Sequence, residues 1–103
     1  MSRAPDSGAL LVRALHRASR AAGCPLEIVA SSWTGWSSAT FTGARHHSHW
    51  QAKPSARLDA WLATLPDMEF DLGGHLVADL AVASIRRTAH HVGLQIEALT
   101  VEV

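Results

Sequence analysis

The sequence lacks a second cysteine, because Cys24 is the only one among its 103 residues. No intramolecular disulfide can form, which suits a reducing compartment and argues against secretion. No apolar run approaches the roughly 20 residues that a membrane-spanning helix needs. The N-terminal segment lacks the uncharged core of a secretory signal peptide, since Arg13, Arg17 and Arg20 interrupt it. We therefore expect a cytoplasmic protein with no membrane partner, whose basic start is a helix with a solvated face and not an organellar transit peptide.

The chain also lacks a net charge, but its charges are unevenly distributed. Up to residue 57 there are seven basic and two acidic residues, and after it two basic and seven acidic ones. The first half could present an anion-binding face, or the two halves, or two subunits, could attract each other. At this length, and with 48% hydrophobic residues, we expect one domain over residues 1–103. The alanine-, arginine- and glycine-rich composition is typical of a bacterium with a GC-rich genome.

Hydrophobic periodicity predicts a helix and then a hairpin in the first half. Asp6 or Ser7 can cap the helix, and Gly23 with Pro25 ends it. Strands are predicted over 26–30 and from 39 to about 51, with Gly43 as a bulge or crossing point. The Ser-, Thr- and Gly-rich segment between them predicts a turn near residues 34–35.

The second half repeats this order. Leu58, Trp61, Leu62 and Leu65 form the apolar face of a short helix that Pro66 ends. A strand is predicted to begin within residues 68–72 and to break or bulge at Gly73-Gly74. The residues predicted to share one face of it are Leu76, Ala78, Leu80, Val82 and Ser84. After a turn around 87–91, the last strand alternates from Val92 and has a register change at Ala98.

The order αββαββ predicts an α+β, two-layer sandwich, with two helices on one face of a mainly antiparallel four-stranded sheet. The other sheet face is then open to a partner. The residues predicted to lie on it are Thr40 or Phe41, Asp79, Gln95 and Glu97. A sheet with an uncovered face and free edges favours a homodimer or another protein partner.

The densest polar motif is Arg45-His46-His47-Ser48-His49-Trp50. In an extended strand, His47 and His49 project from one face about 7 Å apart, so they could bind a divalent metal such as zinc. His90, His91 or a carboxylate could then supply a third ligand. The alternative is a merely exposed polar stretch that binds no cofactor, since no HExxH or paired Cys-His spacing is present.

Four further residues are candidate contacts for a partner or ligand: Trp33, Trp36, Arg45 and His46. The two tryptophans could stack on a ligand or partner, or simply close one end of the core. Zero net charge and an acidic second half argue against nucleic acid, although the arginine face of the first helix could bind an anion.

No nucleophile elbow or phosphate-binding loop is present, and no motif is specific enough to name a family or a catalytic residue. The leading hypothesis is a non-enzymatic binding or self-associating module that uses the open sheet face. The alternative is a small metal-dependent or histidine-assisted enzyme centred on residues 46–49. A third, weaker hypothesis is an anion or nucleic-acid binder.

Overall fold

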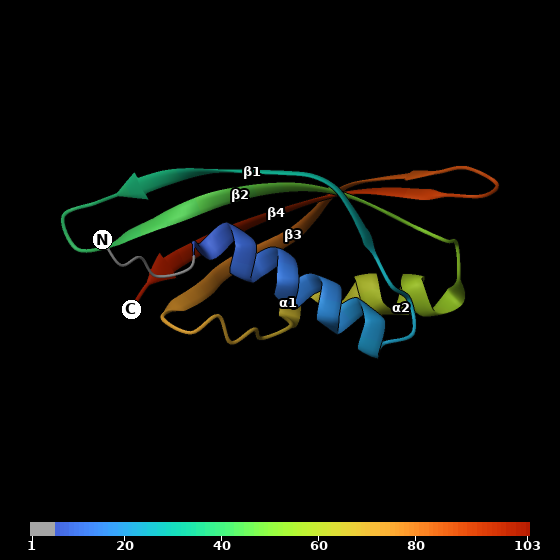
Figure 1. Ribbon diagram of the computed structural model, residues 1–103, viewed down its shortest axis with the longest axis horizontal. Helices are drawn as coiled ribbons and strands as arrows, with labels where there is room; N and C mark the ends of the chain where they lie inside the picture. The colour runs from blue at the N-terminus through green and yellow to red at the C-terminus, as the bar shows by residue number, and fades with distance from the viewer. Residues whose placement is uncertain (1–5) are drawn as a thin grey trace.

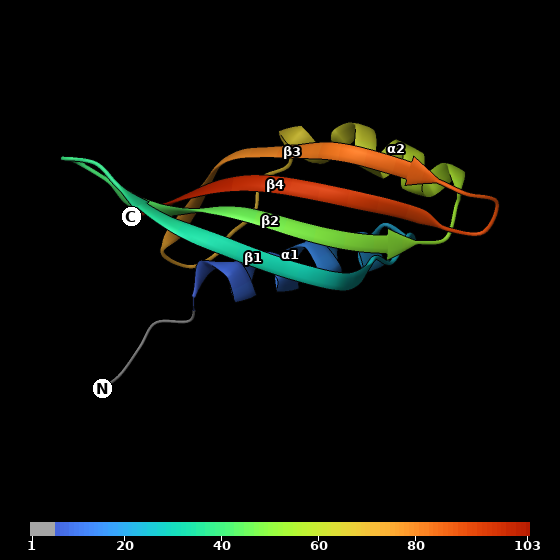
Figure 2. The same cartoon turned by 90° about the horizontal axis from the view of Figure 1, so that it is seen from above.

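The computed structural model describes residues 6–103 and confirms the two-layer α+β sandwich (Figure 1). Its elements are α1 (Ser7–Ala21), β1 (Glu27–Ser37), β2 (Thr42–Ala52), α2 (Ala56–Thr64), the 3-10 turn η1 (Leu65–Asp67), β3 (His75–Arg87) and β4 (Val92–Glu102). The four strands are antiparallel throughout, in the order β1-β2-β4-β3. Both helices lie on one face of this sheet (Figures 1 and 2). The prediction that the N-terminal segment is neither a signal peptide nor a transit peptide rests partly on residues 1–5, which lie outside the described residues.

Helix α1 begins and ends at the residues that its sequence indicates. The Asp6 carboxylate accepts a hydrogen bond from the backbone N–H of Ala9 at 2.7 Å, so Asp6 is the N-cap. Leu11 and Leu15 face the sheet and are buried. Gly23 has φ +78°, which is the left-handed conformation that closes many helix C-termini.

The first hairpin turns later than predicted. The turn comprises Ser38–Phe41, and Thr34-Gly35 lies inside β1. The Ser38 hydroxyl accepts from the backbone N–H groups of Thr40 and Phe41, and the Ser38 N–H donates to the Phe41 carbonyl at 2.7 Å. This side chain fixes the turn, which a composition rich in Ser, Thr and Gly does not locate. Thr40 and Phe41 are therefore turn residues and do not belong to the open sheet face.

The second hairpin differs from the prediction in three details. Strand β3 begins only at His75, because Gly73 and Gly74 both have positive φ and residues 68–74 form no strand. Irregularities between Val77 and Asp79 and between Val82 and Ser84 change which face the side chains occupy. The predicted shared face is therefore wrong: Leu76 pairs with Val101 on the open side, whereas Leu80 is buried under the helices. Strand β4 has no register change at Ala98, since its even-numbered residues from Val92 to Thr100 are all buried.

The two αββ units match closely where the hairpins turn. Thr88 makes the same hydrogen bonds to His90 and His91 that Ser38 makes to Thr40 and Phe41. Strands β2 and β4 both contain 11 residues and begin directly after their turns. The strand order is symmetric about its centre, with β2 and β4 inside and β1 and β3 at the edges. The chain is therefore a tandem repeat in three dimensions.

The core lies between the helices and the inner face of β2 and β4. Its largest fully buried side chains include Trp50, Leu15, Leu26, Leu58, Leu65, Leu94 and Ile96. Within residues 6–103, neither helix combines the length and the hydrophobicity that crossing a bilayer demands. One face of the sheet is thus packed and the other is left uncovered.

Candidate functional site

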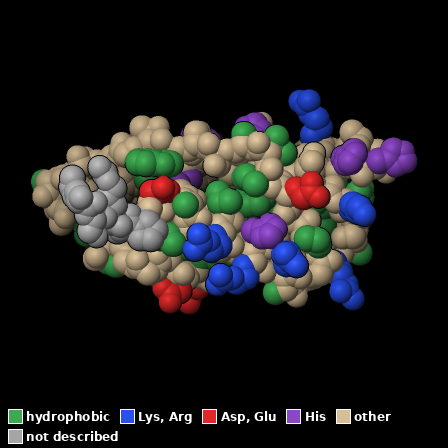
Figure 3. Space-filling model, in the orientation of Figure 1, with side chains coloured by type: hydrophobic (Ala, Val, Ile, Leu, Met, Phe, Trp, Pro, Cys, Tyr) green, Lys and Arg blue, Asp and Glu red, His purple; other side chains and the backbone are tan. Residues whose placement is uncertain are grey.

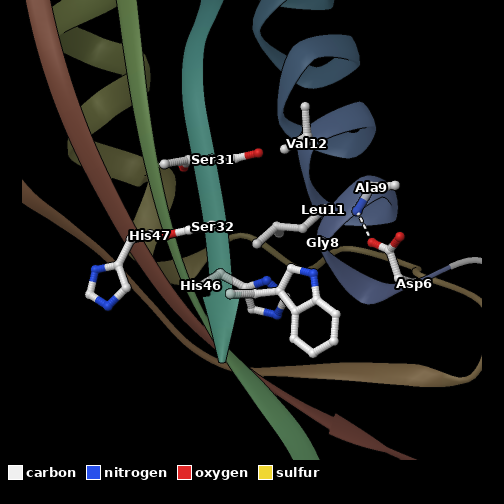
Figure 4. A pocket seen from close by; sticks show the side chains of 11 residues that line it. Asp6, Gly8, Ala9, Leu11, Val12, Ser31, Ser32, His46 and His47 are labelled. Carbon is white, nitrogen blue, oxygen red and sulfur yellow. Dashed lines mark hydrogen bonds between the residues drawn. The ribbon is translucent and has the colours of Figure 1, made fainter. Parts of the chain in front are cut away.

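Strand β2 divides the predicted polar cluster between the two faces of the sheet. Its inward residues are Ala44, His46, Ser48, Trp50 and Ala52, and its exposed ones include Arg45, His47, His49 and Gln51. Neighbouring histidines therefore point in opposite directions, as His46 and His47 do in Figure 4. The cluster is two separate surfaces and not one site.

His46 is the most buried histidine of the cluster, with 4% of its surface exposed. Its Nε2 lies 2.8 Å from Oγ1 of Thr100, and the Thr100 hydroxyl in turn donates to the carbonyl of Ala44 at 3.5 Å. This arrangement places the histidine proton on Nε2, which donates to Thr100. Burial lowers the pKa of His46 below the usual value for histidine; the Asp6 carboxylate opposes this shift, and His75 and His47 reinforce it. His46 is therefore neutral at pH 7.

A pocket of about 300 Å³ lies between the start of α1 and the inner face of β1 and β2 (Figure 4). Its lining includes Trp33 and His46 from the strands, and Asp6 and Gly8 from the start of α1. A Cβ atom at Gly8 would lie 2.9 Å from Cδ1 of Trp33, so only glycine lets the indole approach the helix this closely. Trp33 therefore packs against α1, so its side chain faces the helix layer and not the open face.

Ser48 and Trp50 belong to the same inner face. The Trp50 indole N–H donates to the Ser48 hydroxyl at 2.7 Å, and that hydroxyl donates to the carbonyl of Ile96 at 3.3 Å. Both side chains are buried, so these bonds satisfy polar atoms that water cannot reach. Trp50 thus serves the core and shares no pocket with His49.

The register aligns the open-face residues in rows across the four strands. From β1 to β3 the rows are Trp36-Gly43-Val101-Leu76, Thr34-Arg45-Leu99-Asp79 and Ser32-His47-Glu97-Ala81. The first row is apolar, and the other two carry charged groups. Of the predicted open-face residues, Asp79, Gln95 and Glu97 lie on this surface, and so do Trp36 and Arg45 among the predicted contacts.

At the middle of the open face, charge is segregated by strand, whereas the row Glu27-Gln51-Gly93-Arg86 carries an acid on β1 and a cation on β3. Arg45 lies on β2, whereas Asp79 and Glu97 lie on β3 and β4. His47 Nδ1 is 3.2 Å from Glu97 Oε1, but both side chains are about half exposed, so this pair contributes at most about 1 kcal/mol. All four side chains line a hollow of about 170 Å³ at the middle of the face. The surface is therefore polar, indented and unequally charged across its width.

His47 and His49 share the exposed face of β2, as a pair of metal ligands would need. His90 and His91 lie in the turn after β3. Within residues 6–103, no three His, Cys, Asp or Glu side chains are close enough together to hold one metal ion. The pair could bind a metal only with a ligand from outside this set.

Two neighbours of His46 were absent from the sequence-based candidates. Thr100 follows the inward alternation of Val92, Leu94 and Ile96, so continuing that pattern through Ala98 would have placed it. His75 comes close to His46 only through the pairing of β3 with β4, which the sequence does not specify. The chain matches no protein-family model, no curated protein and no solved structure, so its function has to be inferred from these two faces.

Proposed function

We propose that this protein acts in the cytoplasm as a non-enzymatic, self-associating module whose open sheet face packs against the same face of a second copy. The observation that supports this most is the segregation of charge at the middle of the face, with Arg45 on β2 and Asp79 and Glu97 on β3 and β4. A symmetric interface requires a surface that is complementary to itself. This face meets that requirement for one particular symmetry axis.

The favourable axis runs parallel to the strands, between β2 and β4. Each row then meets the same row of the partner in reverse order, so β2 lies over the partner's β4. His47 meets the partner's Glu97, and Arg45 lies beside the partner's Asp79. An axis perpendicular to the strands would instead place β2 over β2, so that Arg45 would not meet the partner's acids on β3 and β4. The charges therefore select one packing.

The apolar row fits the same packing. Trp36 would meet the partner's Leu76, and Gly43 would meet the partner's Val101. Leu76 is 57% exposed in the single chain, so it has apolar surface left to bury. Sheets packed face to face in this way keep their strands within about 30° of each other, about 10 Å apart.

The face is large enough for a stable dimer. Strands of 11 residues, at about 3.3 Å per residue and about 4.8 Å between strands, give a surface of roughly 36 by 19 Å. Specific interfaces bury about 800 Å² on each partner. The open face is of this order without help from the edges.

The test exchanges charges across the interface. Light scattering and sedimentation should show a dimer for the wild-type chain. Arg45→Glu and Asp79→Arg should each weaken association by at least about 100-fold, because like charges then lie side by side across the interface. Mixing the two variants should restore a heterodimer, since both neighbouring pairs become opposite in charge again. Arg13→Glu, on the exposed side of α1, is the matched control and should leave the dimer intact.

Three results would contradict the proposal. One is a monomer at millimolar concentration. Another is failure of the mixed variants to associate. The third is a dimer that Arg45→Glu does not affect, which would point instead to pairing through the edge strand β1, uncharged from Ile28 to Ser37. Capture of an unrelated protein by a monomeric chain would favour the alternative that the partner is a different protein.

A metal-dependent or histidine-assisted activity remains the second proposal, because His47 and His49 are exposed side by side on β2. It predicts stoichiometric zinc by elemental analysis of protein purified without a nickel column. The metal should be lost in the His47→Ala/His49→Ala variant. Metal-free wild-type protein that does not take up added zinc would refute it.

A further inference from the structure

A second cavity, of about 700 Å³, lies where α1 ends, β2 ends and α2 begins. Four basic side chains line it: His16, Arg20, Lys53 and His91. A fifth, Arg57, reaches the same region, because its Nη1 would lie 2.6 Å from a Cβ atom at Gly23 in the cavity wall. Basic groups from α1, α2 and two loops thus converge on one hollow.

The permanent cations at this cavity are Arg20, Lys53 and Arg57, and they have no acidic partner within residues 6–103. The ion pairs of residues 6–103 are His47–Glu97 and Arg87–Asp59, so neither involves Arg20, Lys53 or Arg57. The cavity wall contains a single carboxylate, Glu27, which accepts a hydrogen bond from the Gln51 amide at 3.3 Å. The cavity therefore carries an excess of positive charge.

The wider surface has the same character. On the side of the molecule seen in Figure 3, lysine and arginine side chains gather over α1 and toward α2. Helix α2 begins at Ala56, three residues after Lys53, and the partial positive charge of its N-terminal end adds to the field of the side chains. An anion would be attracted from solution toward this side.

The shape and chemistry of the cavity suit a small ligand. Cavities that bind small molecules commonly measure about 300–1,000 Å³. Guanidinium and ammonium groups are the usual protein ligands of phosphate oxygens. Pro25, Leu26 and Ala52 form an apolar part of the wall, against which an organic group can pack.

We propose that this cavity binds a small phosphorylated molecule, with Arg20, Lys53 and Arg57 contacting the phosphate. A nucleic-acid backbone is the less suitable ligand, because it would need a continuous basic stripe and not a single hollow. Arg13 and Arg17 lie outside the cavity wall and provide a natural comparison. This site does not depend on the open sheet face.

The test is calorimetric titration with inorganic pyrophosphate and with adenosine monophosphate at low salt. Wild-type protein should bind with saturation at one site. Lys53→Gln and Arg57→Gln should each weaken binding about fivefold, as expected for partly solvated charge pairs. The double variant should lose more, and the matched control Arg13→Gln should bind like the wild-type chain. Lys53, Arg57 and Arg13 are all exposed, so the fold should survive these changes.

Backbone amide shifts of the wild-type protein on adding pyrophosphate give a second measurement. The largest changes should occur at Gly23, Gln51 and Lys53. Three results would overturn the proposal: no saturable binding at millimolar pyrophosphate, shifts centred on Arg13 and Arg17, or equal loss in Arg13→Gln. Tight binding of a single-stranded oligonucleotide without any for pyrophosphate would overturn it too.

Discussion

Gly43 offers the sharpest test of the sheet, because the second repeat contains its own control. A Cβ atom at Gly43 would overlap the carbonyl oxygen of Thr100 and lie 2.9 Å from two ring carbons of Trp36. Gly93 holds the matching position directly after the first residue of β4. A Cβ atom there would meet only Arg86, at 3.9 and 4.0 Å, which is ordinary contact.

The expected cost of Gly43→Ala follows from what has to move. Overpacking commonly costs about 1–3 kcal/mol. Here the obstacle is backbone in a paired strand, so relief also weakens ladder hydrogen bonds worth about 1 kcal/mol each. We expect a loss of about 3 kcal/mol, which lowers Tm by roughly 12–24 °C in a domain of this size. Gly93→Ala should change stability by less than about 0.5 kcal/mol or raise it, because glycine weakens a strand interior.

Urea and thermal unfolding, followed by far-UV circular dichroism and tryptophan fluorescence, measure both changes. The variants are best made in the Arg45→Glu background, so that association does not contribute to apparent stability. Equal m-values would show that the folded state remains comparable. Equal stability of the two glycine variants would refute the close approach of β2 and β4 at Thr100.

Two further predictions concern the inner face of β2. Ser48→Ala should destabilise the protein by about 1–3 kcal/mol, because it leaves the buried indole N–H of Trp50 unpaired. Ser84→Ala, at an exposed serine, is the control. An equal effect of the two variants in urea unfolding would disprove the role of the Ser48–Trp50 hydrogen bond. The pKa of His46 is lowered in the folded chain, so the unfolded chain takes up the proton first as the pH falls. The stability that His46 contributes above about pH 6.5 is therefore lost as the pH falls toward its folded-state pKa. His46→Gln removes this proton linkage and should flatten the acid side of the stability profile, measured by urea unfolding across that pH range; an unchanged slope would show that His46 is not protected by burial.

The fold could be predicted because its signals are local. Helix α1 is defined by its cap at Asp6, its buried Leu11 and Leu15, and Gly23 after its end. Which face each β3 side chain occupies could not be predicted, because it depends on the irregular pairing of β3 with β4. An irregularity after Val77 reverses the side chains that follow it, a second one before Ser84 reverses them back, and nothing in the local alternation marks either.

The candidate site was only partly predictable for a related reason. Alternation correctly separates His46 from His47, since neighbouring strand residues face opposite ways. It does not reveal which face the helices cover, and so which histidine becomes buried against Thr100. The cavity at Arg20 and Lys53 was missed entirely, because it joins the end of α1, the segment between β2 and α2 and the turn at His91, which lie far apart along the chain.

The matching turns at Ser38 and Thr88 give the two αββ units of one chain the same hairpin geometry. The units nevertheless differ in chemistry at equivalent positions, with His47 on β2 where β4 has Glu97. A single chain therefore presents two unlike half-surfaces on one repeated hairpin geometry.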